Sequence, residues 1–393
     1  MRTYDRQFEG MREQGSDNAV LFVTGVQRSG TTLLEKLLSC HRQISLASQP
    51  FPLLFVEAKR ELFRVLGMET SYPLGPLFME RRYTATDLMQ HLTQRHIDAD
   101  RLRTIFAGMR GYSGQYTHVE SQHVDQALER LETGDLAAVS AALYRALCDD
   151  VSLVGGKETL CEEFLPYLLT RGYRGIVILR DPREVLASLN HGRGREFAGR
   201  LKPTLYNLRH WRKSVAFALH LERQPRFAWI RYEDLASCPA TSLNRLAPML
   251  GVEPFTTDLF AAGIRGRDGT LWTGNSSHGS PSGIDSTAVG TRQALLPAGL
   301  AQAVEALCYP ELTYLGYPVS LGWEDVPEVL RGFEDPYPHE REDLAECRNT
   351  AAEMTHELRR VELLDGPATP EETRLYFLFP EVRDALRRAV ARK

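Results

Sequence analysis

The sequence predicts an α/β protein in which a central parallel sheet is flanked by helices, with a helical extension at the C-terminal end. Short apolar runs at 19–24, 175–179 and 227–230 are typical of strands buried on both faces. Segments with helical spacing separate these runs, and strands that alternate with helices favour a parallel sheet. A glycine-rich loop directly after the first run indicates a phosphate-binding domain of the P-loop type.

The chain divides into three parts. Residues 1–18 are polar and charged and are expected to form a leader. Residues 19–320 form the predicted main domain, in which about 53–150 is mainly helical and is expected to bind the second substrate. Residues 321–393 form the extension, with an amphipathic helix predicted over 341–364. The apolar stripe of this helix could pack on the main domain or on a second subunit, which would make the protein a homodimer.

Composition excludes several classes of protein. The net charge of −4 over 393 residues gives no support for nucleic-acid binding. No apolar run approaches the roughly 20 residues needed to span a bilayer, and no secretory signal is visible. The six cysteines lack metal-ligand spacing, so no metal site and no disulfide framework are expected. These features together predict a soluble cytoplasmic protein.

The loop at 25–32 has the glycine spacing of a phosphate-binding loop but lacks its lysine. Gly25 and Gly30 keep the spacing of G-x-x-x-x-G-K-[ST], while Thr31 stands at the lysine position. The loop's cation is Arg28 instead. The sequence therefore predicts an anion site that differs from the magnesium-dependent site of an ATPase.

A second basic position follows the apolar run at 175–179. Arg180 comes directly after that run, at the carboxyl end of a predicted parallel strand, where ligands of open α/β sheets bind. Ser188 lies eight residues later on the predicted helix. A guanidinium and a hydroxyl in this arrangement can bind a phosphate, although Arg180 could equally form an ion pair with Asp181 or Glu184.

These two motifs together resemble those of the sulfotransferases that use 3′-phosphoadenosine 5′-phosphosulfate (PAPS). The loop reads R-S-G-T-T-L at 28–33, and the second motif reads R-D-P-x-x-x-x-x-S at 180–188. The loop arginine is similar to that of the bacterial and tyrosylprotein-type branches. I-R-Y-E-D-L at 230–235 and V-G-G-K at 154–157 resemble two further family segments. The resemblance covers roughly 19–318 and implies the P-loop-like sulfotransferase fold.

The resemblance implies a role for each matching residue. Arg28 would contact the bridging oxygen and the sulfonate, and Lys157 would reach the transferring sulfonate. The remaining implied nucleotide contacts are the loop residues Ser29, Gly30, Thr31, Thr32 and Leu33 at the 5′-phosphate, Arg180 and Ser188 at the 3′-phosphate, Tyr232 near the nucleotide, and Ser277 and Arg292 in a late loop that folds over the 3′-phosphate.

The general base is the part of the family pattern that this sequence does not match. Gln49 occupies the position of the glutamate that serves in the tyrosylprotein branch, and Thr159 occupies that of the histidine in the cytosolic branch. An amide cannot accept the proton of a hydroxyl acceptor. The candidates are therefore other nearby polar residues, with Glu158 named first: Glu158, Glu57, His118 and Glu120.

The sequence thus predicts a PAPS-dependent sulfotransferase that acts on a hydroxyl, phenol or amine of a small molecule or carbohydrate and uses no metal. Fixed cations and N–H groups would stabilise the charge of the transition state. Two alternatives stay open: a catalytically inactive nucleotide-binding protein of the same fold, and a metal-dependent phosphotransferase with an atypical P-loop.

Overall fold

The computed structural model describes residues 19–68, 74–75, 77–79, 83–108, 119–129, 133–192, 201–261, 263–264, 271–272, 274, 289–337 and 350–392. The predicted leader at 1–18 lies outside these residues, as do 338–349 at the start of the predicted C-terminal helix.

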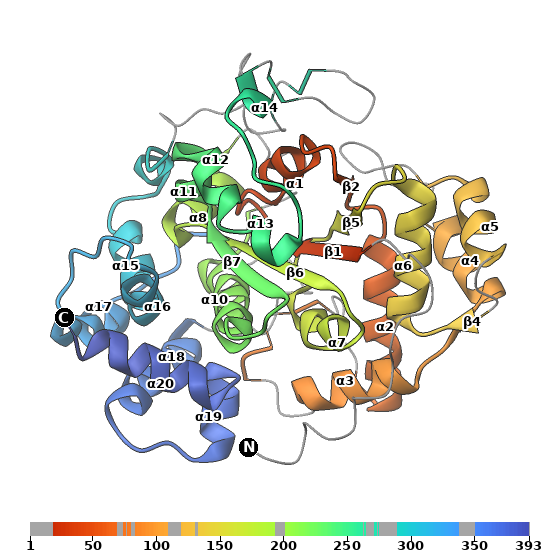
Figure 1. Cartoon of the computed structure of the whole chain (residues 1–393). Coiled ribbons are helices and arrows are strands. Elements are labelled where there is room, and N and C mark those ends of the chain that lie inside the picture. The colour runs from red at the N-terminus through yellow and green to blue at the C-terminus, as the bar shows by residue number, and fades with distance from the viewer. Residues whose placement is uncertain are drawn as a thin grey trace.

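A five-stranded sheet forms the centre of the molecule (Figure 1). Its spatial order is β2-β5-β1-β6-β7, and every neighbouring pair is parallel. The strands are β1 Ala19–Thr24, β2 Ile44–Ser48, β5 Leu153–Lys157, β6 Arg174–Leu179 and β7 Phe227–Arg231. A separate antiparallel pair joins β3 Ile97–Asp98 to β4 Thr133–Gly134. The predicted parallel sheet is confirmed.

Helices cover both faces of the sheet and build the two ends of the molecule. The first half of the chain contains α1 Thr31–Ser39, α2 Pro52–Val65, α3 Ala85–Gln94, α4 Ala99–Gly108, α5 Ser121–Glu129, α6 Leu136–Leu147, α7 Leu165–Thr170 and α8 Pro182–Asn190. The second half contains α10 Thr204–Leu221, α11 Tyr232–Ser237, α12 Pro239–Asn244, α13 Ala247–Leu250, α14 Asp258–Ala261, α15 Leu300–Leu307, α16 Tyr309–Leu315, α17 Val326–Arg331, α18 Thr350–Asp365, α19 Pro370–Phe377 and α20 Pro380–Val390. Among the described residues, 3₁₀ turns lie at Glu162–Phe164, Arg292–Leu295 and Trp323–Asp325.

Alternation along the strands divides the interior into two cores. Leu21 and Val23 of β1 pack with α1 and with α11 to α13 on one face. Val20 and Phe22 pack with α2, α6, α7 and α10 on the other face. Because successive side chains of a strand point to opposite faces, residues 157 and 158, at the end of β5 and just beyond it, are directed toward different cores.

The order of the strands places a switch point between β1 and β6. From β1 the chain continues through α1 to β2, and from β6 it continues through α8 and α10 to β7 at the opposite edge. Connections that leave neighbouring strands in opposite directions open a crevice at the carboxyl ends of those strands. The loop after β1 and the residue after β6, which carry the two predicted phosphate motifs, meet at this crevice.

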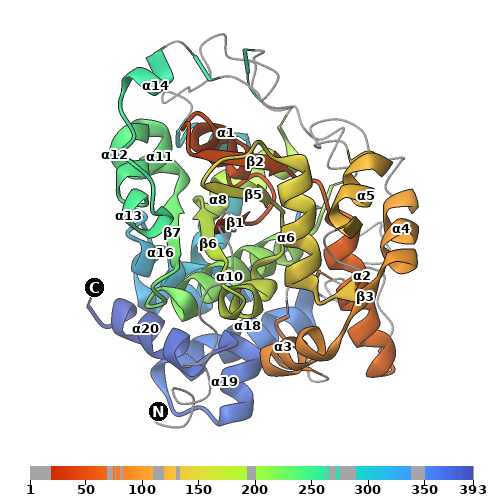
Figure 2. The same cartoon turned by 45° about the vertical axis from the view of Figure 1, so that its right-hand side comes forward.

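The C-terminal helices pack against the main domain. Helices α18 to α20 lie beside α10, α16 and α17 in both views (Figures 1 and 2). Glu357 of α18 is buried and accepts hydrogen bonds from Arg209 Nη2 at 2.8 Å and Arg212 Nη1 at 2.6 Å, both on α10. Met354, from the predicted apolar stripe, is buried as well. Of the two alternatives that the sequence left open, the structure shows packing within the chain for this part of the helix.

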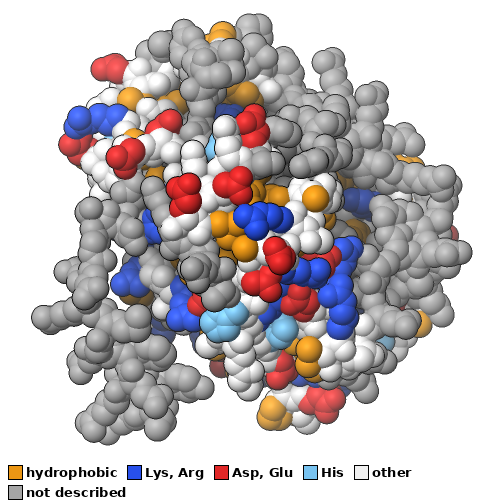
Figure 3. Space-filling model, turned by 90° about the vertical axis from the view of Figure 1, so that its right-hand side faces the viewer, with side chains coloured by type: hydrophobic (Ala, Val, Ile, Leu, Met, Phe, Trp, Pro, Cys, Tyr) orange, Lys and Arg blue, Asp and Glu red, His pale blue; other side chains and the backbone are white. Residues whose placement is uncertain are grey.

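The side of the molecule that carries α4 and α5 has acidic and basic side chains intermingled (Figure 3). Ion pairs lie within and between helices of this region: Arg60 pairs with Glu57 of the same helix, α2, at 2.6 Å, and Arg101 of α4 pairs with Glu57 at 3.0 Å. Among the described residues, every helix is too short or too polar to cross a membrane.

Candidate active site

The loop between β1 and α1 turns sharply at Gly30. This residue has a left-handed backbone conformation, with φ of 101°. A Cβ at this position would collide with the ring of Tyr232, which packs against the loop. Only glycine meets both conditions without strain. Tyr232, which the resemblance places near the nucleotide, is therefore in direct contact with the phosphate-binding loop.

The loop presents the first turn of α1 to the crevice. The first bond of the helix runs from Leu34 N to Gly30 O at 3.0 Å. The N–H groups of Thr31, Thr32 and Leu33 precede it, and such groups have no carbonyl partner within the helix. They form an anion site at the positive end of the helix dipole. Since the Leu33 side chain is buried in the core, only its N–H can contribute.

Ser29 is used differently from the expectation. Its N–H donates to Val26 O at 3.2 Å, and its hydroxyl donates to the same oxygen at 2.7 Å. Both groups therefore close the loop on itself in this structure.

Two arginines donate to the hydroxyl of Ser188, and a third is bonded to the backbone of one of them. Arg28 Nε donates to Ser188 Oγ at 3.1 Å, and Arg292 Nη1 donates to the same oxygen at 3.2 Å. Arg180 Nη1 donates to the carbonyl of Arg28 at 3.3 Å. These side chains come from the loop after β1, the end of β6, helix α8 and the turn at 292–295. Positions 264 residues apart in the chain thus form one basic cluster.

In this arginine cluster (Arg28, Arg180 and Arg292), Arg180 and Arg292 are buried and Arg28 is half-buried. Burial lowers the pKa of Arg28 to about 10, assisted by the charges of Arg292 and Arg180. Burial and the charge of Arg180 also lower the pKa of Arg292. Like charges that are withdrawn from water repel one another, so an anion among them is strongly favoured. The Arg180 Nε–H is buried and has no hydrogen-bond partner among the described residues, which leaves a donor for such an anion.

Two aromatic residues hold Arg180 in place. Its guanidinium lies 4.3 Å from the centre of the Tyr232 ring, in a cation–π contact. The indole Nε1 of Trp211, on α10, donates to the Arg180 carbonyl at 2.7 Å. The orientation of Arg180 is thus determined by side chains from two separate helices.

Lys157 ends β5 on the α1 side of the sheet. It is 4% exposed, and its Nζ donates to Gln49 Oε1 at 3.4 Å. Burial lowers the pKa of Lys157, and the charges of Glu35 and Glu158 oppose that shift. Gln49 has a left-handed backbone with φ of 47°, and its N–H donates to Lys157 O at 2.7 Å. The amide at the family's base position is therefore held against the lysine.

Glu158 is anchored on the opposite face. Its N–H donates to Val23 O at 2.9 Å, and its Oε1 accepts the N–H of Phe51, the residue before α2, at 2.7 Å. Burial raises the pKa of Glu158 to about 8, against the hydrogen bond from Phe51 and the charge of Lys157. The side chain thus caps a helix, and it also has a pKa within the range that suits a general base.

Two of the other candidates for the base, Glu57 and Glu120, form their bonds with side chains of the surface. Glu57 pairs with Arg60 and Arg101 at the surface. Glu120 is exposed and accepts a hydrogen bond from Gln122. His118 lies outside the described residues, as does Ser277, the other predicted residue of the late loop.

Two carboxylates near these motifs, those of Glu35 and Glu184, are buried, which the motifs did not indicate. Glu35 of α1 is fully buried, and burial raises its pKa, with the charges of Lys36 and Lys157 opposing. Glu184 of α8 accepts a hydrogen bond from Arg180 Nη2 at 3.0 Å. The sequence indicated Glu184 only as an ion-pair partner of Arg180, and the structure shows in addition that Glu184 is 2% exposed. The apolar spacing of each helix could have indicated that these positions face inward.

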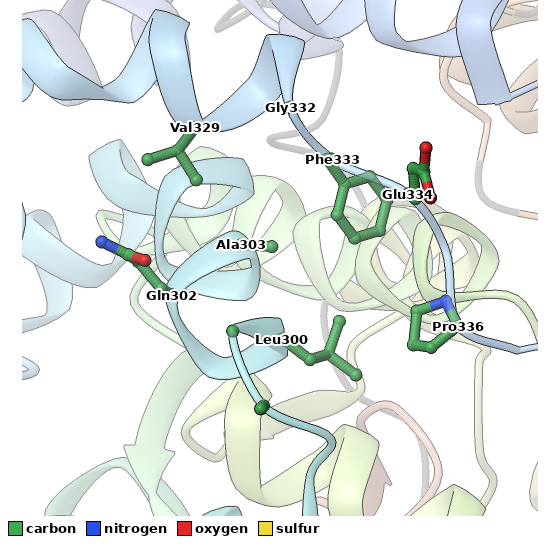
Figure 4. Close-up of a pocket in the computed structure, with 10 residues that line it drawn as sticks. Leu300, Gln302, Ala303, Val329, Gly332, Phe333, Glu334 and Pro336 are labelled. Carbon is green, nitrogen blue, oxygen red and sulfur yellow. The ribbon is translucent and has the colours of Figure 1, made fainter.

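A hollow away from the arginine cluster has no basic lining residue. This hollow of about 400 Å³ lies between α15 and the turn after α17 (Figure 4). Leu300, Val329 and Phe333 line it, and Glu334 is its only charged lining residue. Among the described residues, no group of three or more His, Cys, Asp or Glu side chains could hold a metal ion.

Comparisons with known proteins agree with the motifs. A family model described as "Sulfotransferase family" matches residues 20–257. No curated protein matches the chain. Among solved structures, the sulfotransferase domain from the Synechococcus PCC 7002 olefin synthase is 18% identical, with a TM-score of 0.43 over 78% of this chain and 98% of that one. Retinol dehydratase, solved with androsterone and the inactive cofactor PAP, is 16% identical, with a TM-score of 0.36 over 75% and 80%.

Proposed function

Because the chain belongs to the sulfotransferase family, we propose that it transfers a sulfonate group from PAPS to a hydroxyl, phenol or amine of a small molecule or carbohydrate. The observation that carries the proposal is the arginine cluster around Ser188, which faces the same crevice as the first turn of α1. One molecule with a phosphate at each end of an adenosine would occupy both sites. A nucleotide without the 3′-phosphate would leave the cluster without its anion.

The described residues fit this donor. Arg180, Ser188 and Arg292 would bind the 3′-phosphate, and the N–H groups of Thr31 and Thr32 would bind the 5′-phosphate. The donor supplies a sulfonate that is activated by its phosphate leaving group. Lys157 would stabilise the negative charge that develops on the transferring oxygens, so that side-chain cations replace a metal. For Arg28 to take its expected place at the bridging oxygen, its guanidinium would have to leave Ser188.

The 3′-phosphate site is tested by ligand-induced thermal stabilisation. We expect 3′-phosphoadenosine 5′-phosphate (PAP) to raise the Tm more than AMP, ADP or ATP, without added magnesium. Arg180→Ala should weaken PAP binding by about 10- to 100-fold, because a hydrogen bond to a charged group contributes about 1.5–3 kcal/mol. Its affinity for AMP should change little.

Arg174→Ala provides the matched control. Arg174 begins the same strand that precedes Arg180, and its Nη1 donates to Leu250 O at 2.7 Å. This variant should bind PAP like the wild type. Equal stabilisation of the wild type by PAP and AMP would exclude the proposed 3′-phosphate site, and stabilisation by ATP that requires magnesium would favour the phosphotransferase alternative.

Glu158 is the proposed general base. Its pKa of about 8 means that the carboxylate form increases as the pH rises through that value. We therefore expect kcat to rise between about pH 7 and 9, and Glu158→Gln to lower kcat by about 10²- to 10⁴-fold, the usual range for general-base catalysis. Turnover is measured as PAP released from PAPS with an acceptor found in a panel of phenols, alcohols, amines and sugars.

The contribution of Glu158 to the stability of the fold changes with pH in the opposite direction from kcat. A carboxyl group whose pKa is raised in the folded state binds protons more tightly there, so its contribution is present at low pH and is lost as the pH rises from 4.5 toward 8. Glu158→Gln keeps an acceptor for the Phe51 N–H and should remove this loss. Full activity of Glu158→Gln with an unchanged pH profile would assign Glu158 to capping α2 alone.

One observation favours a second candidate, a nucleotide-binding protein without catalysis. Gln49 occupies the position of the family's glutamate base and is bound to Lys157. Tight PAP binding without transfer to any acceptor of the panel would support this alternative. Gln49→Glu would then be the variant to assay for gain of activity.

We also propose a cytoplasmic location. The free thiols of Cys161, Cys238 and Cys308 support a reducing compartment. A homodimer through a remaining face of the C-terminal helices is a separate expectation, which the molar mass of the protein in solution tests.

A further inference from the structure

Glu184 links two parts of the arginine cluster. Its Oε2 accepts from Arg180 Nη2 at 3.0 Å, and its Oε1 accepts from the N–H of Gln293 at 2.8 Å. Gln293 follows Arg292 in the turn at 292–295. One carboxylate therefore holds both the strand-end arginine and the backbone beside the arginine of the late turn.

This contact determines where Arg292 points. Arg292 reaches Ser188 Oγ at 3.2 Å, and both Ser188 and Glu184 lie on α8. The turn at 292–295 is thus fastened to α8 at two points four residues apart, once by its backbone and once by its side chain. Because Glu184 is 2% exposed, water does not readily replace it as the acceptor for the Gln293 N–H.

The charge of the cluster also depends on Glu184. Arg28, Arg180 and Arg292 bring three positive charges together, and the carboxylate reduces their sum to +2. A phosphate monoester carries about −1.5 to −2 at neutral pH. The net charge of the described cluster therefore balances that of one such group. Arg180 divides its bonds, because its Nη1 donates to the Arg28 carbonyl and its Nη2 donates to the Glu184 carboxylate.

A hollow of about 420 Å³ borders this contact. Glu184 and Gln293 line it, and its arginines, Arg183 and Arg231, are paired with Asp181 and Asp234. Loss of the Glu184 carboxylate would thus leave the Gln293 N–H beside open space, because the other acidic residues that line this hollow, Asp181, Glu233 and Glu305, are already bound to other groups.

We propose that Glu184 is a positioning residue for recognition of the 3′-phosphate: it holds Arg180 and the late turn in one arrangement, so that Arg180 and Arg292 bind the same phosphate. The proposal rests on the proposed function. It assigns selectivity for the bisphosphorylated nucleotide to a carboxylate that does not touch the nucleotide.

A double-mutant cycle tests this role. Dissociation constants for PAP and for AMP are measured by calorimetry on the full chain for the wild type, Glu184→Ala, Arg292→Ala and the double variant. We expect each single change to weaken PAP binding by about tenfold and to alter AMP binding by less than about twofold, since only PAP carries the 3′-phosphate. The double variant should lose no more than about twofold beyond Glu184→Ala, because coupled residues are not additive.

Two further variants separate positioning from general disruption. Glu184→Gln keeps an oxygen for the Gln293 N–H and should bind PAP with an affinity between those of the wild type and Glu184→Ala. Glu305→Gln is the matched control: Glu305 is a buried carboxylate that accepts from Arg183 Nη1 at 3.2 Å, and among the described residues it forms no bond with Arg28, Arg180 or Arg292, so PAP selectivity should be retained.

The outcomes distinguish the two proposals. A wild type that binds PAP no better than AMP would contradict the proposed function. A selective wild type whose Glu184→Ala variant binds PAP equally or more tightly would overturn the role of Glu184 alone, as would equal losses for PAP and AMP or effects that multiply in the double variant.

Discussion

Lys157→Ala is expected to lower kcat by about 10²- to 10³-fold, the usual cost of losing one donor to the developing charge of a transition state. Lys157 is nearly fully buried at the carboxyl end of β5, where its ammonium is bound to Gln49. A buried cation acts in a medium of low dielectric constant, so its effect on nearby charge is larger than in water. The Kd for PAP should change by less than about threefold, because PAP lacks the sulfonate that Lys157 would contact.

Lys36→Ala is the matched control, because Lys36, like Lys157, lies close to the carboxylate of Glu35. Lys36 pairs with Glu35 at 3.2 Å but lies in the body of α1 rather than at a strand end. Its turnover should remain close to that of the wild type. If Lys157→Ala and Lys36→Ala have equal kcat, or if Lys157→Ala loses PAP affinity instead of turnover, Lys157 does not act on the sulfonate.

Glu357→Ala is expected to lower the free energy of unfolding by about 3–5 kcal/mol, the cost of leaving a buried ionic partner unpaired. Burial alone would raise the pKa of Glu357, but the charges of Arg212 and Arg209 outweigh it and hold that pKa far below its ordinary value of 4.5. The contribution of Glu357 to stability is therefore complete above pH 4.5 and is lost as the pH falls below it. Urea unfolding at neutral pH measures the difference.

Glu362→Ala is the matched control on the same helix. Glu362 pairs with Arg359 at 2.8 Å, but its side chain is 64% exposed. Exposed pairs contribute about 0–1 kcal/mol, so this variant should be close to the wild type. Equal stability of the two variants would mean that the buried pairs between α18 and α10 do not hold the C-terminal helices on the domain.

The strands and the two phosphate motifs could be predicted because each depends on local sequence. The runs at 19–24 and 175–179 form neighbouring parallel strands, β1 and β6, as their apolar character indicated. The carboxyl ends of parallel strands share one edge, so the loop with Arg28 and the residue after β6, Arg180, come together as a consequence of the fold. The order of the strands therefore brings Arg28 and Arg180 together, as the two sequence motifs indicated.

The details of the site could not be predicted, because they depend on contacts between distant segments. Only packing against α8 shows that Arg292, in the predicted late loop, is 8% exposed and bonded to Ser188. Gln49 and Lys157 are 108 positions apart in the chain. The left-handed backbone at position 49 could not be predicted either, because the residue there is not a glycine or an asparagine. Glu184 was correctly considered as a partner of Arg180, but its second bond to Gln293 is visible only in three dimensions.

Helix α10 connects the C-terminal helices to Arg180. Arg209 and Arg212 of this helix donate hydrogen bonds to Glu357. Trp211, which lies between them in the sequence, donates a hydrogen bond to the carbonyl of Arg180. Removal of the residues after about 320 would leave the buried guanidinium groups of Arg209 and Arg212 without Glu357, on the same helix whose Trp211 holds Arg180. Any redesign of the C-terminal helices therefore has to include α10.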